Sequence, residues 1–368
     1  MVQDSLAGVK VLDLSQYIPG PFATLLLADL GAEVVKVEPP QGDPMAAFEP
    51  CDGDGISPYY KAVNAGKTVV RLDLKTVEGK AAFERLVVRA DVLLESFRPG
   101  VMERLGFGPD HLRALNPGLV HCALSGFGQT GPWRLRAGHD ITYMALAGVL
   151  GLNGPAAQPP HMPFPPVADH VSALGAVTAV LGALLRKART GQGATLDVSI
   201  FESALHLNYQ ALLLASRGGG PDREADLLNG GAACYRAYRC ADGGFLAVGA
   251  LEPKFWHAFC NAVGRPEWVA RQAEPLPQTS LIEDVAAALE TRPLGHWTHL
   301  LENVDCCVEP VLTPAEALAQ PHVQDRCLAA GGPGGLDLRF PAWSDSRPPA
   351  PRKSYREENF ETVIALWQ

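Results

Sequence analysis

Near its N-terminus the sequence places two short apolar runs on either side of a helical stretch, and this pattern limits the fold more than any other feature. Residues 9–14 (VKVLDL) and 33–37 (EVVKV) have the length and composition of buried strands, whereas residues 22–30 between them are typical of a helix. Pro21 stands where a first-turn proline is tolerated, and Gly31 stands where a helix ends. This strand–helix–strand unit predicts two parallel strands joined by a right-handed crossover.

The same alternation continues to about residue 200. Strands that alternate with helices form a parallel sheet that helices cover on both faces. The sequence therefore predicts an α/β fold with a Rossmann-like large domain and an open parallel sheet. We expect its further strands at 68–74, 91–95, 118–125 and 195–200, and further helices at 79–90 and 171–189.

Beyond residue 200, glycine-rich breaks replace the alternation. Gly218-Gly219-Gly220-Pro221 interrupts the pattern, and residues 235–240 and 244–250, separated by Asp242-Gly243, predict a hairpin. Helical segments follow the hairpin, which indicates a smaller α+β domain. The predicted organisation is a large domain at 1–200, a linker at 201–225, a small domain at 226–325 and a C-terminal segment, 326–368, that returns to the large domain.

Charge and composition exclude two classes of protein. Asp and Glu number 40 against 31 Lys and Arg, a net charge of −9, which argues against nucleic acid as the main partner because phosphate backbones require a basic face. Hydrophobic residues make up 47% of the chain and charged residues only 19%, so the chain can bury a sizeable core and is not globally disordered.

No membrane partner and no secretion signal are expected. The longest apolar run, residues 173–185, is too short to span a bilayer and contains Thr178. The N-terminus carries Asp4 and lacks a basic region followed by an apolar one. The eight cysteines form neither CxxC pairs nor Cys/His metal spacings, a pattern typical of reduced thiols. We therefore expect a cytoplasmic protein.

Two phosphate-binding motifs that such a fold can carry are missing. Neither GxGxxG nor GxxxxGK[ST] follows the first predicted strand, where the turn reads Ile18-Pro19-Gly20-Pro21. A standard dinucleotide site is therefore not expected. Ligands of open α/β sheets nevertheless bind outside the carboxyl ends of the strands, so we expect functional side chains in the loops after residues 14, 37, 95 and 125.

The loop after residue 95 combines an aromatic ring with cations. Phe97 and Arg98 lie side by side there, and Arg104 follows one helical turn later. An aromatic ring beside a guanidinium suits a purine and a phosphate, although a surface loop with a solvated arginine is an equal alternative. Lys67 and Lys75 flank the neighbouring strand and could neutralise more phosphate, or could simply be solvated.

Three acidic residues and one histidine are candidates for proton transfer. In Gly138-His139-Asp140 the glycine permits a close backbone approach, and histidine is the usual general base near neutral pH. A structural His–Asp hydrogen bond is the alternative. Asp169 precedes the long apolar helix and could act as its cap. Glu252 follows a predicted strand, where the alternative is a helix-start acid.

From Leu6 to about residue 325 the chain resembles the family III CoA-transferases (the CaiB/BaiF superfamily), and within them most closely the α-methylacyl-CoA racemases. The resembling stretches occur in the family's order and at its spacing. They are LAGVKVLDLSQYIPGPFATLLLADLGAEVVKVE, SFRPGVMERLGFGP, LSGFGQTGP, AGHDITYMALAGVL, RTGQGATLDVSIFES, LNGGAACYRAYRCADGGFLAVGALEPKFW and DCCVEPVLTPAEA.

The resemblance implies an enzyme that acts on acyl-CoA thioesters in an interlocked homodimer, with each active site between the large domain of one protomer and the small domain of its partner. It implies that His139 and Asp169 are the two bases, that Asp140 and Tyr143 lie in the same motif, and that Glu252 supports His139. Coenzyme A enters as part of the substrate, and no metal or redox cofactor is implied. The expected CoA contacts are Lys67, Leu72, Lys75, Phe97, Arg98, Arg104, Gly138 and Tyr143.

Racemisation of a 2-methylacyl thioester needs two bases on opposite faces of a planar enolate, with their pKa values set apart by their environments. Backbone N–H groups at the start of the helix after Asp169 are the expected donors to the enolate oxygen. In the transferase branch of the family the residue matching Asp169 is instead a nucleophile that forms an acyl anhydride and then a CoA thioester. His139 favours the racemase, and a binding protein without turnover is a third possibility.

Two segments depart from the family pattern. Racemases typically have a glycine-rich ADFGGG-like run after the aspartate, whereas this chain has Ala168-Asp169-His170-Val171-Ser172-Ala173, with larger side chains beside the acyl group. The arginine of a VDRP-like motif after the second strand is Pro39 in this chain. We therefore expect differences in the acyl pocket and in the nucleotide contacts.

Overall fold

The computed structural model of the protein describes residues 2–332 and 334–367 and divides into two compact units, each with its own buried core. The first unit is Met1–Ala147, Pro165–Leu207 and Leu318–Gln368, and the second is Gly148–Phe164 and Asn208–Ala317. Residues 148–164 belong to the second unit and not to the large domain that the sequence pattern predicts at 1–200. The backbone N–H of Ala156 donates to Glu224 Oε2 at 2.8 Å, a link from this segment to the loop before the hairpin.

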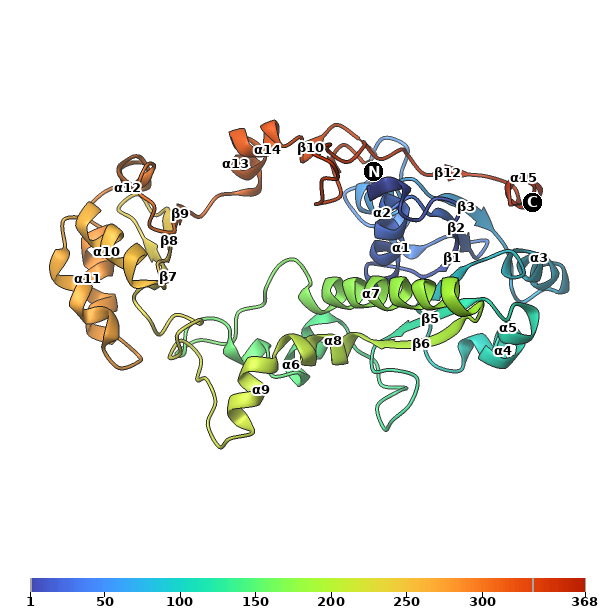
Figure 1. Ribbon diagram of the computed structural model, residues 1–368, viewed down its shortest axis with the longest axis horizontal. Coiled ribbons are helices and arrows are strands. Elements are labelled where there is room, and N and C mark those ends of the chain that lie inside the picture. The colour runs from blue at the N-terminus through green and yellow to red at the C-terminus, as the bar shows by residue number, and fades with distance from the viewer. Residues whose placement is uncertain (1, 333, 368) are drawn as a thin grey trace. The chain divides into compact units, whose positions relative to one another are not determined.

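A seven-stranded sheet forms the centre of the first unit, and all of its neighbouring strands run parallel (Figure 1). The predicted α/β class with an open parallel sheet is therefore confirmed. The last strand, β12, comes from the C-terminal segment and pairs with β3 at the edge of the sheet. In spatial order the strands are β12 (Arg356–Glu357), β3 (Thr68–Arg71), β2 (Glu33–Glu38), β1 (Lys10–Leu14), β4 (Val92–Glu95), β5 (Val120–Ser125) and β6 (Ala194–Ser199).

The strand order reverses at β1, which lies between β2 and β4. Chain connections that start at β1 therefore proceed towards β2 and β3 on one side, and those from β4 proceed towards β5 and β6 on the other. Loops on the two sides diverge at this point and leave a crevice outside the carboxyl ends of the strands, which is where doubly wound sheets bind ligands. The topology thus selects the loops after β1 and β4 as the centre of a binding site.

Helices cover both faces of the sheet. One face packs on α1 and α7, and the other packs its apolar side chains on α3, α4, α5 and α15. Buried side chains on that second face include Phe83, Leu112 and Trp367, the residue after α15. Each helix of the first unit begins close to its predicted position where a prediction was made. The helices are α1 (Pro19–Asp29), α2 (Pro58–Val63), α3 (Val77–Val87), α4 (Val101–Leu105), α5 (Pro109–Leu115), α6 (Asp140–Leu146), α7 (Val167–Thr190), α8 (Ile200–Leu207), α14 (Pro321–Asp325) and α15 (Phe360–Leu366).

Helix α7 is longer than the sequence pattern indicated. It begins at Val167, so Asp169 lies in its first turn and does not cap it, which corrects that alternative. Within residues 2–332 and 334–367, α7 is the one helix that is long and apolar enough, by length and composition, to cross a membrane. However, α7 packs on α1, β5, β6 and α8, and Figure 1 shows the two strands beside it. These are the contacts of a core helix.

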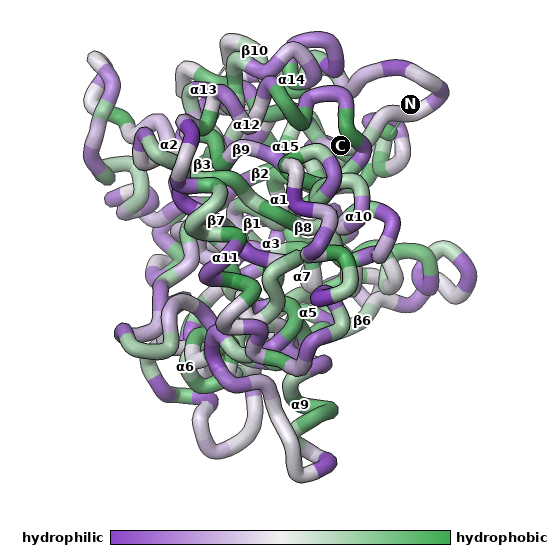
Figure 2. Tube along the Cα trace, turned by 90° about the vertical axis from the view of Figure 1, so that its left-hand side faces the viewer, coloured by the Kyte–Doolittle hydropathy of each residue, from purple (hydrophilic) through white to green (hydrophobic). Residues whose placement is uncertain are grey.

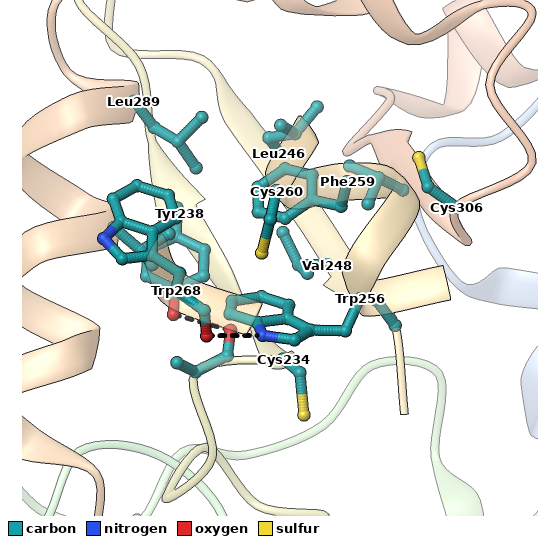
Figure 3. Close-up of a cluster of buried hydrophobic side chains, with 14 of the residues drawn as sticks. Cys234, Tyr238, Leu246, Val248, Trp256, Phe259, Cys260, Trp268, Leu289 and Cys306 are labelled. Atoms are coloured by element: carbon teal, nitrogen blue, oxygen red, sulfur yellow. Dashed lines mark hydrogen bonds between the residues drawn. The ribbon is translucent and has the colours of Figure 1, made fainter. Parts of the chain in front are cut away.

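The second unit is built on the antiparallel sheet β7–β8–β9, with the predicted hairpin at β7 and β8. Its core gathers Trp256, Phe259 and Trp268 against the strands (Figure 3), and the indole N–H of Trp256 donates to the carbonyl of Trp268 at 3.0 Å. Its elements are α9 (Tyr209–Ala215), β7 (Tyr235–Arg239), β8 (Phe245–Gly249), α10 (Pro253–Ala262), α11 (Thr279–Leu289), α12 (Leu294–Leu301), β9 (Val308–Pro310) and α13 (Pro314–Leu318).

Candidate active site

Two adjoining cavities lie at the carboxyl edge of the seven-stranded sheet. The larger, about 460 Å³, is lined by the loops after β1, β4 and β5 and by the starts of α6 and α7. The smaller, about 240 Å³, is lined by the loops after β1, β2 and β3 and by α4. Gln16 and Phe97 line both cavities. The crevice that the strand order predicts therefore holds two neighbouring cavities.

The larger cavity brings His139 and Asp169 together. His139 precedes α6, and the start of this helix is closed by Thr142, whose hydroxyl accepts from the His139 N–H at 2.9 Å and donates to the His139 carbonyl at 2.7 Å. The main chain of His139 is thus held at both of its polar groups, while its side chain is exposed at the cavity. Asp169 reaches the same cavity from the first turn of α7.

Asp140 connects the starts of the two helices. Its Oδ1 accepts from the backbone N–H of Asp169 at 3.1 Å, and Asp140 does not line the cavity. This contact makes Asp140 a positioning residue. It also corrects the expectation for the enolate donors, because the Asp169 N–H is already bonded to Asp140 and the His170 N–H donates to the Pro166 carbonyl at 3.4 Å.

The environment of Asp169 favours its neutral form. Burial, followed by the nearby Asp140 carboxylate, raises the pKa of Asp169 to about 6, although His170 and His139 act in the opposite direction. No basic side chain forms an ion pair with Asp169 within the part of the chain that the structure describes. A carboxyl group with this pKa is present in both protonation states near neutral pH, as acid–base catalysis requires.

His170, the first residue of the segment that departs from the family's run after the aspartate, does not line the cavity. Its Nδ1 lies 2.5 Å from the Pro166 carbonyl oxygen, and its ring meets the edge of Phe22 at a centroid distance of 5.0 Å. It therefore lies at the edge of the core between α1 and α7 and offers no second imidazole to the larger cavity.

The predicted CoA contacts divide between the two cavities. Leu72 and Lys75 line the smaller one, and Arg98 lines the larger one, while Phe97 touches both. Arg104 lines neither cavity. Its Nη1 lies beside Gly100, where a Cβ would be 3.2 Å away.

Lys67 is a correction to the predicted CoA contacts. Its side chain is fully buried, and its ammonium donates to Asp13 Oδ2 at 3.1 Å, to the Pro21 carbonyl at 2.9 Å and to Asn64 Oδ1 at 3.1 Å. All three of its donors are used inside the protein, so none is left for a phosphate. The sequence could not distinguish this lysine from a solvated one because Asp13 is 54 residues away.

Gly138 and Tyr143 meet each other in the wall of the larger cavity. A Cβ at Gly138 would lie 2.5 Å from the Tyr143 ring, so the close approach that we predicted at this glycine is made by the tyrosine. Pro39, at the position of the family arginine, lines the smaller cavity. Arg71 donates to the neighbouring Pro40 carbonyl at 3.1 Å and pairs with Glu357 at 2.5 Å.

Sequence analysis missed four residues that line the larger cavity: Gln16, Tyr17, Arg134 and Arg136. Tyr17 has a φ of 64°, in the left-handed region that a bulky side chain rarely adopts and that is enriched at functional sites. The two arginines precede His139 in the same loop, which was a signal in the sequence. Gln16 and Tyr17 had none beyond their place after the first strand.

Glu252 lies in the second unit, at the N-cap of α10, and is exposed. Its support of His139 stays a prediction. Among residues 2–332 and 334–367, no group of three or more His, Cys, Asp or Glu side chains is arranged to hold a metal ion.

Comparisons with known proteins agree on one family. The sequence model of CoA-transferase family III matches residues 6–346. The chain is 36% identical to the alpha-methylacyl-CoA racemase of Homo sapiens, over 88% of this chain and 81% of the relative. It is 32% identical to the acetyl-CoA:oxalate CoA-transferase of Acetobacter aceti, over 94% and 92%.

A solved structure agrees with these sequence relatives. The crystal structure of a CaiB/BaiF family protein from Brucella suis matches with a TM-score of 0.85 and 28% identity, over 99% of both chains. The family match, the sequence relatives and the shared fold all span most of the chain. This protein is therefore a member of CoA-transferase family III, an enzyme family that acts on CoA thioesters.

Proposed function

We propose that this enzyme is an acyl-CoA racemase of the α-methylacyl type. The observation that carries the proposal is that His139 and Asp169 line one cavity and that the pKa of Asp169 is raised to about 6. One of the two groups removes the proton from C2 of the acyl thioester, and the electron pair of the broken C–H bond moves into the enolate. The other group returns a proton to the opposite face of C2, so the configuration inverts.

The two cavities suit the parts of an acyl-CoA. The nucleotide lies in the smaller cavity against Leu72 and Lys75, and the pantetheine arm passes Gln16 and Phe97, which border both spaces. The thioester then reaches His139 and Asp169. Three arginines, Arg98, Arg134 and Arg136, line the larger cavity of a chain whose net charge is −9, which favours an anionic ligand such as an acyl-CoA.

CoA transfer is the alternative. In that reaction the Asp169 carboxylate attacks the thioester carbonyl and CoA leaves as the thiolate. The thiolate then attacks the Asp169 carbonyl of the anhydride, which releases the donor acid and leaves a CoA thioester on Asp169 that passes CoA to the acceptor acid. One relative, the succinyl-CoA–D-citramalate CoA-transferase of Chloroflexus aurantiacus, is 33% identical, so both branches of the family are comparably similar to this chain. A histidine at position 139, beside Asp169 in the same cavity, favours the racemase, because inversion needs a second proton-transfer group.

We also propose a homodimer in the cytoplasm. Helix α9 is largely hydrophobic (Figure 2), yet it has no buried residue, and its leucines 212–214 are 39–50% exposed. On α7, Leu174 and Leu185 are 52% and 63% exposed. Exposed apolar helices of this kind are typical of surfaces that a second copy covers. All eight cysteines are free thiols, as is usual in a reducing compartment.

Proton exchange in D2O separates the two reactions. A 2-methylacyl-CoA of one configuration is incubated with the enzyme in D2O without a second acid, and the C2 proton signal and optical purity are followed by NMR. We expect both to be lost, because CoA transfer leaves the C2 proton in place. No exchange over a panel of acyl groups, together with CoA transfer to added carboxylates, would establish the transferase instead.

The variant His139→Ala sharpens this test. Loss of a general base should lower the rate of inversion at C2, followed as loss of optical purity, by about 10²–10⁴-fold. The matched control is His299→Ala, which removes a side chain that is 90% exposed and lies in the second unit. If His139→Ala inverts C2 at the wild-type rate, the racemase mechanism is wrong.

A further inference from the structure

The hydroxyl group of Tyr143 lies at the same cavity, but the proposed proton transfer gives it no role. Tyr143 lies on α6, is only 5% exposed, and lines the larger cavity with His139 and Asp169. Its ring is held between two glycines: a Cβ at Gly126 would lie 2.4 Å from the Tyr143 hydroxyl oxygen, and one at Gly138 would lie 2.5 Å from the ring. The chain thus leaves space for this side chain on two sides.

The Tyr143 hydroxyl also differs in its hydrogen bonding from the hydroxyls of the other buried tyrosines. Tyr60 donates to Glu38 Oε1 at 2.7 Å, and Tyr238 donates to the Ala233 carbonyl at 2.7 Å. Tyr143 uses its backbone N–H and carbonyl within α6, but its hydroxyl forms no hydrogen bond with any residue that the structure describes. The residue is buried, but its hydroxyl oxygen is not sealed off from the cavity, so a ligand there can accept a hydrogen bond from it.

The proposed reaction needs a donor of this kind. Removal of the C2 proton places negative charge on the thioester oxygen, and a positioned donor must stabilise that charge. The N–H groups of Asp169 and His170, which we expected to do so, are bonded to Asp140 and Pro166. The cavity wall therefore has to supply a donor from elsewhere.

We propose that the Tyr143 hydroxyl donates a hydrogen bond to the carbonyl oxygen of the acyl thioester and to the enolate oxygen that forms from it. Tyr143 keeps its proton throughout. The C2 proton moves to the base, its electron pair forms the C1–C2 double bond, and the carbonyl π pair becomes the oxygen charge that the hydroxyl stabilises. Burial, together with the Asp169 charge, raises the pKa of Tyr143 to about 12, so it remains a neutral donor.

This inference rests on the proposed racemase function, and the variant Tyr143→Phe tests it. Phenylalanine retains the ring between Gly126 and Gly138 and removes only the hydroxyl. We expect kcat for C2 proton exchange in D2O to fall about 100-fold, as for the loss of other oxyanion donors, with little change in KM. The control Tyr238→Phe removes a buried hydroxyl of the second unit and should leave kcat unchanged.

Isotope-edited infrared spectroscopy gives a readout that does not depend on turnover. The ¹³C=O stretch of an acyl-CoA labelled at C1 should lie at lower frequency on the wild-type enzyme than on Tyr143→Phe, because a hydrogen bond weakens the carbonyl bond. Replacement of Tyr143 by 3,5-difluorotyrosine, a stronger donor of the same shape, should lower the frequency further. This second variant keeps the test decisive if Tyr143→Phe fails to fold.

The outcomes separate the two proposals. If the wild-type enzyme exchanges the C2 proton and Tyr143→Phe has the same kcat, or raises only KM, the role of Tyr143 is wrong and the racemase stands. An unchanged carbonyl frequency leads to the same conclusion. If the wild-type enzyme exchanges no proton, the racemase is wrong, and the infrared shift still decides whether Tyr143 contacts the thioester.

Discussion

Two aspartates near the carboxyl edge of the same sheet have opposite environments. Asp13, at the end of β1, is fully buried and accepts from the Lys67 ammonium at 3.1 Å, the Thr24 hydroxyl at 2.5 Å and the Ser15 N–H at 2.8 Å. Burial alone would raise its pKa, but Lys67, Lys36 and the two hydroxyls hold the pKa of Asp13 well below its usual range.

Asp169 has none of these compensating cations. Burial and, after it, the charge of another carboxylate, Asp140, raise the pKa of Asp169 to about 6. The comparison shows how one residue type serves two purposes. A carboxylate whose hydrogen bonds and charge are fully satisfied stabilises the strand ends, whereas one with little compensation is free to exchange protons with a substrate.

The largest effect that would test this contrast is on activity. Asp169→Asn should lower the rate of either CoA-thioester reaction by about 10³-fold, because the amide neither accepts the C2 proton nor attacks the carbonyl. Its free energy of unfolding should not fall, since no ion pair is lost. The control Asp110→Asn alters a fully exposed side chain and should leave the rate unchanged. An active Asp169→Asn enzyme would remove this residue from the site.

Lys67→Met should lower the stability of the protein, an effect smaller than the loss of activity in Asp169→Asn. It leaves the buried Asp13 carboxylate without its ion-pair partner, and breaking a buried pair in this way costs about 3–5 kcal/mol of unfolding free energy. Lys61→Met is the matched control, because Lys61 pairs with two half-exposed aspartates, and urea unfolding should show a loss below about 1 kcal/mol. Equal losses in the two variants would contradict the structural role of Lys67.

The pH dependence of stability should have opposite signs at the two aspartates. The pKa of Asp169 is raised from 3.8 to about 6, so the folded state binds more protons between these values and Asp169 destabilises it as pH rises through them. Asp169→Asn should therefore be about as stable as the wild type near pH 4 and ~2 kcal/mol more stable at pH 7.

Asp13→Asn should show the reverse. The pKa of Asp13 is lowered, so its stabilising contribution is complete above its ordinary pKa of 3.8 and is lost as pH falls below that value. The deficit of Asp13→Asn should be largest near neutral pH and shrink in acid. Urea unfolding of the wild type and both variants measures the Asp169 trend between about pH 4 and pH 7 and the Asp13 trend below pH 3.8, and slopes of the same sign in the two windows would overturn the comparison.

Much of the fold could be predicted from local sequence. The apolar runs at β1, β2 and β4 are short, are bounded by turn residues and alternate with amphipathic helices, so their parallel pairing follows from neighbouring residues alone. Residues 148–164 were misplaced because this proline- and glycine-rich segment has no periodicity, and its association with the second unit depends on contacts such as Ala156 with Glu224.

The candidate site was predictable only in part. The motif around His139 and the family resemblance identified His139 and Asp169, and the structure brings both to one cavity. The sequence suggested Lys67 as a phosphate ligand because it records a cation without its surroundings. The role of Asp140 as a link between α6 and α7 was equally hidden, since it depends on the Asp169 N–H, 29 residues away.

By itself, the sequence determined the class of the fold, the family and the identity of the two proton-transfer candidates, because these depend on residue order and local pattern. Only the tertiary structure decided which charged groups are compensated. It buried Lys67 against Asp13, left Asp169 beside Asp140, and placed the Tyr143 hydroxyl in a cavity without a partner. The physical reason is that charge compensation and hydrogen bonding depend on distances between residues far apart in the chain, which sequence order does not contain.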